Sequence, residues 1–130
     1  MLSFDDTAKG REVAVLIHHE TAAVYLGHGN LQKAEEVWLK ASALDPRDVR
    51  CRKELAALYE RTDRDRSALR VCEQLRDIEP ANADYWLNVG VLNARLARYD
   101  AALAAVEEAI RLDPANPKYR QAHDVIRGAK

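Results

Sequence analysis

The sequence predicts an all-α fold in which antiparallel helix pairs stack on one another, with about seven helices in 130 residues. First, an aliphatic residue, an acid and a proline recur every 34 residues, at Pro46, Pro80 and Pro114. Second, small and apolar residues precede these prolines at helical spacings of three and four. Third, each proline is followed by a residue that can cap a new helix. These observations indicate three copies of a helix-turn-helix unit and one further helix.

The first unit covers about residues 15–48. Its second helix is marked by residues at spacings of three and four, namely Leu31, Ala34, Trp38 and Ala41. The stretch GHGN at 27–30 predicts a tight turn before that helix, so the residues upstream of it form the first helix. Residues 1–14 remain open, since they either lengthen this first helix or lie loosely outside it.

The second and third units cover about residues 49–82 and 83–116. Tight turns are predicted at 61–65 and 96–100, between two helices in each unit. Twelve residues before each proline stands an alanine, which indicates a close approach of two helices in every unit: Ala34, Ala68 and Ala102. Larger residues eight positions before the prolines fill space between helices, and these are Trp38, Cys72 and Val106.

The prolines end the second helix of each unit. A residue before proline is pushed out of the helical region, so these helices should stop at Asp45, Glu79 and Asp113. Short polar side chains that can cap the next helix follow at Asp48, Asn82 and Asn116. Residues 117–130 then form a capping helix, with Tyr119, Ala122 and Ile126 on one face.

This pattern resembles the tetratricopeptide repeat family, whose 34-residue unit has conserved positions for tryptophan, glycine, alanine and proline. The third copy carries Trp86, Gly90, Ala102, Ala109 and Pro114 at those places. Several residues depart from the pattern and are expected to loosen packing locally: His18, Thr21, Arg52, Leu75 and Asn93. The resemblance implies a single domain over residues 1–130, a right-handed α-solenoid with a concave groove lined by the first helices.

The composition excludes several classes of partner. With 48% hydrophobic residues, 32% charged residues and a net charge of -1, no overall field favours nucleic acid or an anionic membrane. The longest apolar run, 101–106, is far too short for membrane insertion. Cys51 and Cys72 have no metal-ligand spacing and are interpreted as small buried hydrophobic residues. A cytoplasmic location is favoured if the chain is complete.

No motif predicts catalysis or a cofactor. Glycine-rich phosphate loops, nucleophile elbows and HExxH motifs are missing from the sequence, so an enzyme is not expected. His18, His19 and His28 lack a Cys or acid to complete a metal set, which favours surface roles. The arginine-rich stretch 61–70 is interrupted by acids and has no interleaved aromatic residues, so a solvated turn is favoured over nucleic-acid binding.

The resemblance implies that the groove takes up a peptide or helix of a partner protein. By the period, the residues that should face it are Leu16, His19, Ala23, Arg50, Lys53, Ala57, Leu87, Asn88, Val91 and Arg95. One subgroup of the family grips the C-terminal carboxylates of chaperones, and its places here hold His19, Ala23, Glu54, Asp84 and Asn88. Only Asn88 partly suits that role, which disfavours chaperone tails as partners.

The leading hypothesis is therefore a non-catalytic interaction module. The alternative is a structural or self-associating repeat segment, excised from a larger multidomain protein, whose helices pack against neighbouring repeats or a second copy. In that case the groove-facing residues Leu16 and Leu87 would be covered by the chain's own N-terminal segment or by another copy.

Overall fold

The computed structural model describes residues 8–130, and within that range every regular element is an α-helix. The bounds of the seven helices are α1 (Ala8–Gly27), α2 (Leu31–Leu44), α3 (Arg50–Arg61), α4 (Asp65–Ile78), α5 (Ala83–Arg95), α6 (Tyr99–Leu112) and α7 (Pro117–Ala129). The predicted all-α fold of stacked helix pairs is confirmed. The open segment 1–14 divides, because residues 8–14 lengthen α1 while residues 1–7 lie outside the described part.

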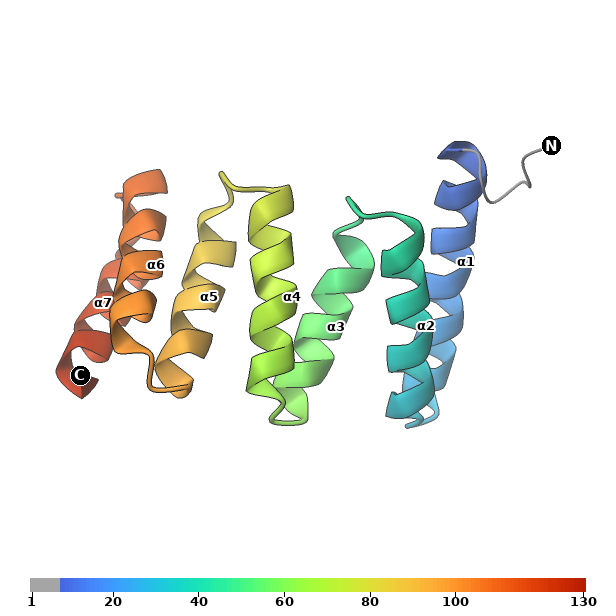
Figure 1. The fold of residues 1–130 in the computed structure, drawn as a ribbon, viewed down its shortest axis with the longest axis horizontal. Helices are drawn as coiled ribbons and strands as arrows, with labels where there is room; N and C mark the ends of the chain where they lie inside the picture. The colour runs from blue at the N-terminus through green and yellow to red at the C-terminus, as the bar shows by residue number, and fades with distance from the viewer. Residues whose placement is uncertain (1–7) are drawn as a thin grey trace. The chain divides into compact units, whose positions relative to one another are not determined.

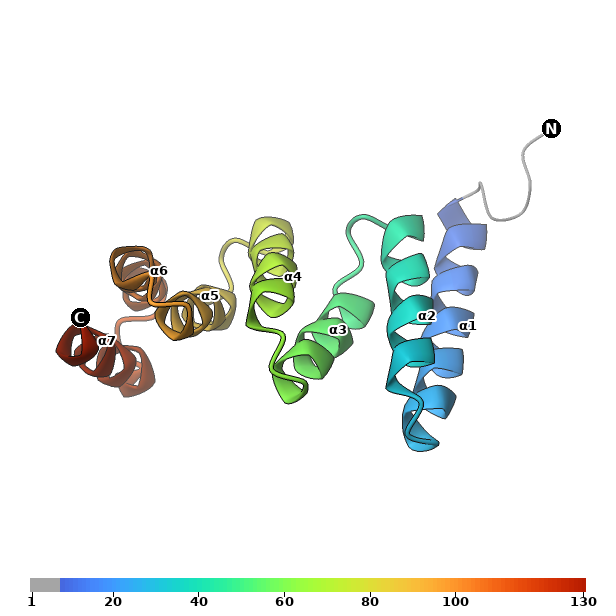
Figure 2. The same cartoon turned by 60° about the horizontal axis from the view of Figure 1, so that its bottom comes forward.

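The packing separates into two compact units, one reaching up to Leu58 and the other comprising Tyr59–Lys130. In the first unit α1 lies beside α2 (Figure 1). In the second unit α5 packs on both α4 and α6, and α7 lies beside α5 and α6 (Figure 2). The boundary between the units falls inside α3.

The turn between the two helices of each repeat is a Schellman motif, and it occurs three times. The residue with positive φ recurs every 34 positions, as Gly29 (φ 76°), Asp63 (φ 56°) and Ala97 (φ 60°). The amide after it donates to a carbonyl five residues earlier: Asn30 to Tyr25 at 2.9 Å, Arg64 to Tyr59 at 2.8 Å and Arg98 to Asn93 at 2.8 Å. Glycine suits this backbone best, and a left-handed alanine costs about 1 kcal/mol. The turns therefore follow the predicted register even where the sequence lacks glycine.

The ends of the second helices also match the prediction. Asp45, Glu79 and Asp113 are the C-caps of α2, α4 and α6. The next helices begin behind polar caps, since the side chain of Asn82 accepts from the amide of Asp84 and that of Asn116 from the amide of Lys118. Asp48 acts likewise, because its carboxylate accepts from the amide of Cys51 at 2.9 Å.

The core lies where the repeat predicts it. Ala34, Ala68 and Ala102 are fully buried, as expected for positions where two helices approach closely. Trp38, Cys72 and Val106 are equally buried. Cys51 and Cys72 are buried and free, and burial raises the pKa of each thiol to about 12, so both remain protonated near neutral pH.

Two departures from the family pattern are well packed rather than loose. The Arg52 side chain is 8% exposed, and its guanidinium donates to the backbone carbonyls of Ser42, Asp45 and Asp48 at 3.2, 3.1 and 2.7 Å. Asn93 is buried and its amide donates to the carbonyl of Val89 at 3.0 Å. The expectation of local loosening at these two positions is wrong, because each polar side chain finds a backbone acceptor.

Candidate functional site

Two of the predicted groove residues line a shallow hollow in the N-terminal unit. It has a volume of about 420 Å³ and lies between α1 and the segment that joins α2 to α3. Leu16, which is 42% exposed, lies on its α1 side and Arg50 on its α3 side. The carboxylates of Asp45 and Asp48 in the lining already accept from backbone amides, of Arg47 and Cys51 respectively. This hollow is therefore mixed in polarity, and two of its three acids accept hydrogen bonds from backbone amides close to them in the chain.

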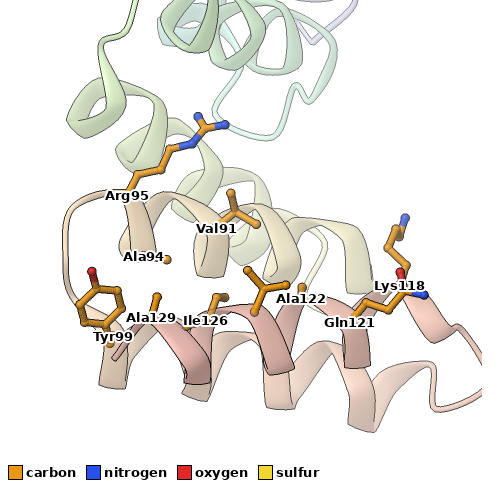
Figure 3. A pocket seen from close by; sticks show the side chains of 10 residues that line it. Val91, Ala94, Arg95, Tyr99, Lys118, Gln121, Ala122, Ile126 and Ala129 are labelled. Atoms are coloured by element: carbon orange, nitrogen blue, oxygen red, sulfur yellow. The ribbon is translucent and has the colours of Figure 1, made fainter.

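Two other predicted residues line a more apolar hollow in the C-terminal unit. This hollow, about 480 Å³ in volume, lies between α5 and α7 (Figure 3). Val91, Ala94 and Arg95 come from α5 and Tyr99 from the start of α6. The residues of α7 that complete the lining are Lys118, Gln121, Ala122, Val125, Ile126 and Ala129. Its middle is aliphatic, and its polar groups lie toward the ends.

The floor of this hollow belongs to the core. Ile126 forms a buried cluster with Ala102 and Val106, and Ala94, Tyr99 and Ala122 pack against it. Val125 differs from these residues because 72% of its side chain is exposed, although it lines the same hollow. The hollow thus has a buried floor and one large apolar side chain that is open to solvent.

Polar contacts at the start of α5 hold α7 in position. The carboxylate of Asp84 accepts from Lys118 Nζ and from the Tyr119 hydroxyl, each at 2.8 Å. These hydrogen bonds, the one from Lys118 first, hold the pKa of Asp84 below its usual value. Burial, together with the bond to Asp84, raises the pKa of Tyr119 to about 12. The first turns of α5 and α7 are therefore joined, so the two helices start at the same end of the hollow.

The charged groups of the lining are both cationic. Arg95 forms an ion pair with Asp65 of α4 at 3.6 Å, and Lys118 forms an ion pair with Asp84 at 2.8 Å. Both side chains are about half exposed, at 50% and 52%. Among the described residues that line the hollow there is no carboxylate. Figure 3 shows Lys118 at one end and Arg95 near the other.

The remaining predicted groove residues line neither hollow. Leu87 is half-buried against the Ala102 cluster, so it supports the core as well as the surface. His19 is half-buried, and its Nδ1 has no hydrogen-bond partner within the described residues. The others lie exposed on the first helices: Ala23, Lys53, Ala57 and Asn88. All of these stay candidates by position.

The sequence analysis does not predict that α7 lines this hollow. It predicts only that the capping helix has Tyr119, Ala122 and Ile126 on one face. A second stripe, Ala122, Val125 and Ala129, at spacings of three and four, widens that apolar face and was the available signal.

Within residues 8–130, no cluster of three or more His, Cys, Asp and Glu side chains is arranged to hold a metal ion. None of the helices described has both the length and the apolar character needed to span a bilayer.

Comparison with known proteins supports the interpretation of the chain as a series of helix-turn-helix repeats. The family model described as Tetratricopeptide repeat matches residues 83–116. No sequence among curated proteins matches significantly. The fold is similar to the first TPR of Spaghetti (RPAP3) bound to the HSP90 peptide SRMEEVD, with a TM-score of 0.72, 19% identity, and coverage of 88% of this chain and 91% of that one.

Two further solved structures have the same fold. The second TPR domain of human RPAP3, in complex with the HSP70 peptide SGPTIEEVD, has a TM-score of 0.75 and 15% identity, with coverage of 90% of this chain and 98% of that one. The Arabidopsis OM64 TPR domain has a TM-score of 0.73 and 21% identity, with coverage of 92% and 99%. At these identities the likeness concerns the fold alone.

Proposed function

We propose that this chain is a non-catalytic module which binds a peptide or helix of a partner protein, since its third repeat matches the tetratricopeptide repeat model and its fold is that of tetratricopeptide repeat domains. The observation that carries the proposal is the apolar hollow between α5 and α7, to which the predicted groove residues Val91 and Arg95 contribute. Burying the exposed Val125 against a partner would release free energy of about 25 cal/mol for each Å² of apolar surface. The two RPAP3 domains named above share this fold, and the structure of each contains a bound peptide.

The partner segment differs in chemistry from the chaperone tails in those two complexes. At the places where the family's carboxylate-gripping subgroup has lysine, asparagine and arginine, this chain has His19, Ala23, Glu54, Asp84 and Asn88, two of which are acids. The carboxylate of Asp84 already accepts from Lys118 and Tyr119. A peptide ending in several carboxylates would meet like charge there. We therefore expect the peptide SRMEEVD to show no measurable binding.

The test is capture of a partner by the groove. The double variant Val91→Glu with Arg95→Glu should lose the partner that the wild-type protein captures from its native source, because an apolar contact and a cation of the hollow are both replaced by negative charge. Circular dichroism should show unchanged helicity. If the double variant keeps its helicity and still captures the same partner, groove binding is wrong.

A second candidate function is self-association, and exposed apolar residues on α1 favour it. Ile17 and Val24 are more than half exposed, and they lie seven residues apart on one face of the helix. Sedimentation velocity separates the two functions, since a monomer whose mass is independent of concentration would exclude self-association through α1.

A further inference from the structure

We infer that the hollow between α5 and α7 takes up an amphipathic helix of a partner protein, with acidic residues at both ends of its apolar stripe. The inference rests on the proposed function and specifies the occupant of one part of the proposed groove. Three features of the hollow carry it: its length, the polarity of its middle and the charge at its ends.

The length suits a helix of about three turns. The lining on α7 runs from Lys118 to Ala129, which corresponds to about 16 Å along a helix axis. Three alanines, Ala94, Ala122 and Ala129, are spread over the two walls. Small side chains allow a third helix to approach at the 8–10 Å interaxial distance that is usual for packed helices.

The apolar middle favours a helix over an extended peptide. The residues there are Val91, Ala94, Ala122, Val125 and Ile126, whose side chains offer no hydrogen-bonding group. The backbone groups of α5 and α7 are used within those helices. An extended ligand would leave N–H and C=O groups buried without partners, at a cost of about 1–3 kcal/mol for each. A helical ligand satisfies its own backbone, so it can fill the hollow without that cost.

The ends of the hollow favour acids on the ligand. Lys118 lies at one end and Arg95 near the other (Figure 3). Their present partners, Asp84 and Asp65, do not belong to the lining. One N–H of the Lys118 ammonium is used by Asp84, and ion pairs as exposed as these are weak, about 0–1 kcal/mol. Each cation can therefore turn donors toward a ligand carboxylate.

The experiment measures binding of a designed helix by fluorescence anisotropy. The probe is a labelled synthetic peptide of about 14 residues, with leucines at i, i+4 and i+7 and one glutamate beyond each end of that stripe. A scrambled peptide of the same composition, which has no apolar stripe, is its control. We expect the designed peptide to bind the full chain at least about tenfold more tightly than the scrambled peptide.

Two matched protein variants locate the site. Val125→Glu puts a charge into the hollow at a residue that is 72% exposed, so the fold should tolerate it, and binding should weaken at least about tenfold. Leu39→Glu likewise puts a charge at an exposed apolar residue, 47% exposed on α2, and should alter binding less than about twofold. In addition, Arg95→Glu should weaken binding of the peptide that carries glutamate at that end. A peptide with lysine in place of that glutamate should bind the Arg95→Glu variant more tightly than the glutamate peptide does.

Several results would overturn the inference. Equal binding of the scrambled peptide would do so, as would unchanged binding by a folded Val125→Glu variant. Self-association of the protein that Val125→Glu abolishes would assign the hollow to a second copy instead. If the designed helix fails while the wild-type protein still captures a partner that the Val91 and Arg95 double variant loses, the helix inference is wrong and the proposed function stands.

Discussion

Two equivalent helix junctions differ in the position of an arginine. At the α2–α3 junction the arginine lies on the helix that follows, and at the α4–α5 junction it lies on the helix that precedes. At the first junction Arg52 of α3 reaches back and donates to three carbonyls, including that of Ser42. At the second, 34 residues later, Trp86 stands in place of Arg52 and Arg76 in place of Ser42. The guanidinium of Arg76 lies 5.1 Å from the Trp86 ring, whose N–H donates to the carbonyl of Pro80 at 2.8 Å.

This comparison teaches that one junction can be closed by two chemistries. In both, a side chain from the first turn of a helix donates to backbone carbonyls that come before that helix in the chain. Arg52 does so through charge-assisted hydrogen bonds from a buried position, while Trp86 uses one indole N–H and a cation–π contact from a half-buried position. The junction at Arg52 should therefore be the more sensitive of the two to a change of side chain.

The largest expected effect breaks the first junction. Arg52→Leu removes the side-chain donors to the carbonyls of Ser42, Asp45 and Asp48, of which that of Ser42 is buried, so the free energy of unfolding should fall by about 3 kcal/mol. Trp86→Leu at the equivalent position keeps an apolar side chain and should cost about 1–2 kcal/mol. Urea denaturation of both variants measures the difference. Equal losses would contradict the comparison.

The same junction can be converted rather than broken. Ser42→Arg together with Arg52→Trp rebuilds the α4–α5 chemistry between α2 and α3. We expect the double variant to be more stable than the sum of its two single changes predicts, by about 0.5–1 kcal/mol. Additive losses would show that the two chemistries depend on more of their surroundings than this pair.

An intermediate effect on stability is expected at a position that is glycine in the third repeat and alanine in the second. Position 90 is glycine, whereas the second repeat has Ala56 at the equivalent place. A Cβ on Gly90 would lie 2.5 Å from Val106 Cγ2 and 3.1 Å from the carbonyl oxygen of Ala102. Gly90→Ala should therefore lower the free energy of unfolding by about 1–2 kcal/mol.

The second repeat also suggests a rescue of that variant. It carries the smaller Cys72 where the third repeat has Val106. Adding Val106→Cys to Gly90→Ala removes the Cγ2 methyl group in the way, so the double variant should recover part of the loss in thermal or urea denaturation. A double variant less stable than Gly90→Ala alone would show that the carbonyl of Ala102 limits the space.

The smallest effect depends on pH and on the contacts that hold α7. The folded-state pKa of Asp84 lies below the ordinary value of 3.8, so its contribution to stability is present above pH 3.8 and is lost as the pH falls through the folded-state pKa. The protection of the α7 amides, measured relative to their intrinsic exchange rates at each pH, should fall below pH 3.8 more in the wild type than in Asp84→Asn. Arg50 stands at the equivalent place in the second repeat, where no such loss is expected. The same pH response in Asp84→Asn would rule out Asp84 as its source.

Local rules in the sequence determined the helices, their ends and the turns between them. The positive-φ residues at 29, 63 and 97 and the caps at 48, 82 and 116 depend on hydrogen bonds between residues close in the chain, so a 34-residue period is enough to place them. The fully buried alanines follow from the same period. Helix count and core register could accordingly be predicted without a structure.

Only the tertiary structure decided how side chains far apart in the sequence are used. It placed Lys118 against Asp84 and set α7 beside α5, which brought Val91 and Arg95 together with Val125 around one hollow. It also turned Arg52 inward onto backbone carbonyls, although an arginine at that place looked like a packing defect. The physical reason is that such contacts depend on which backbone carbonyls stay unpaired and which apolar surfaces stay uncovered on neighbouring helices. A repeat period does not specify either.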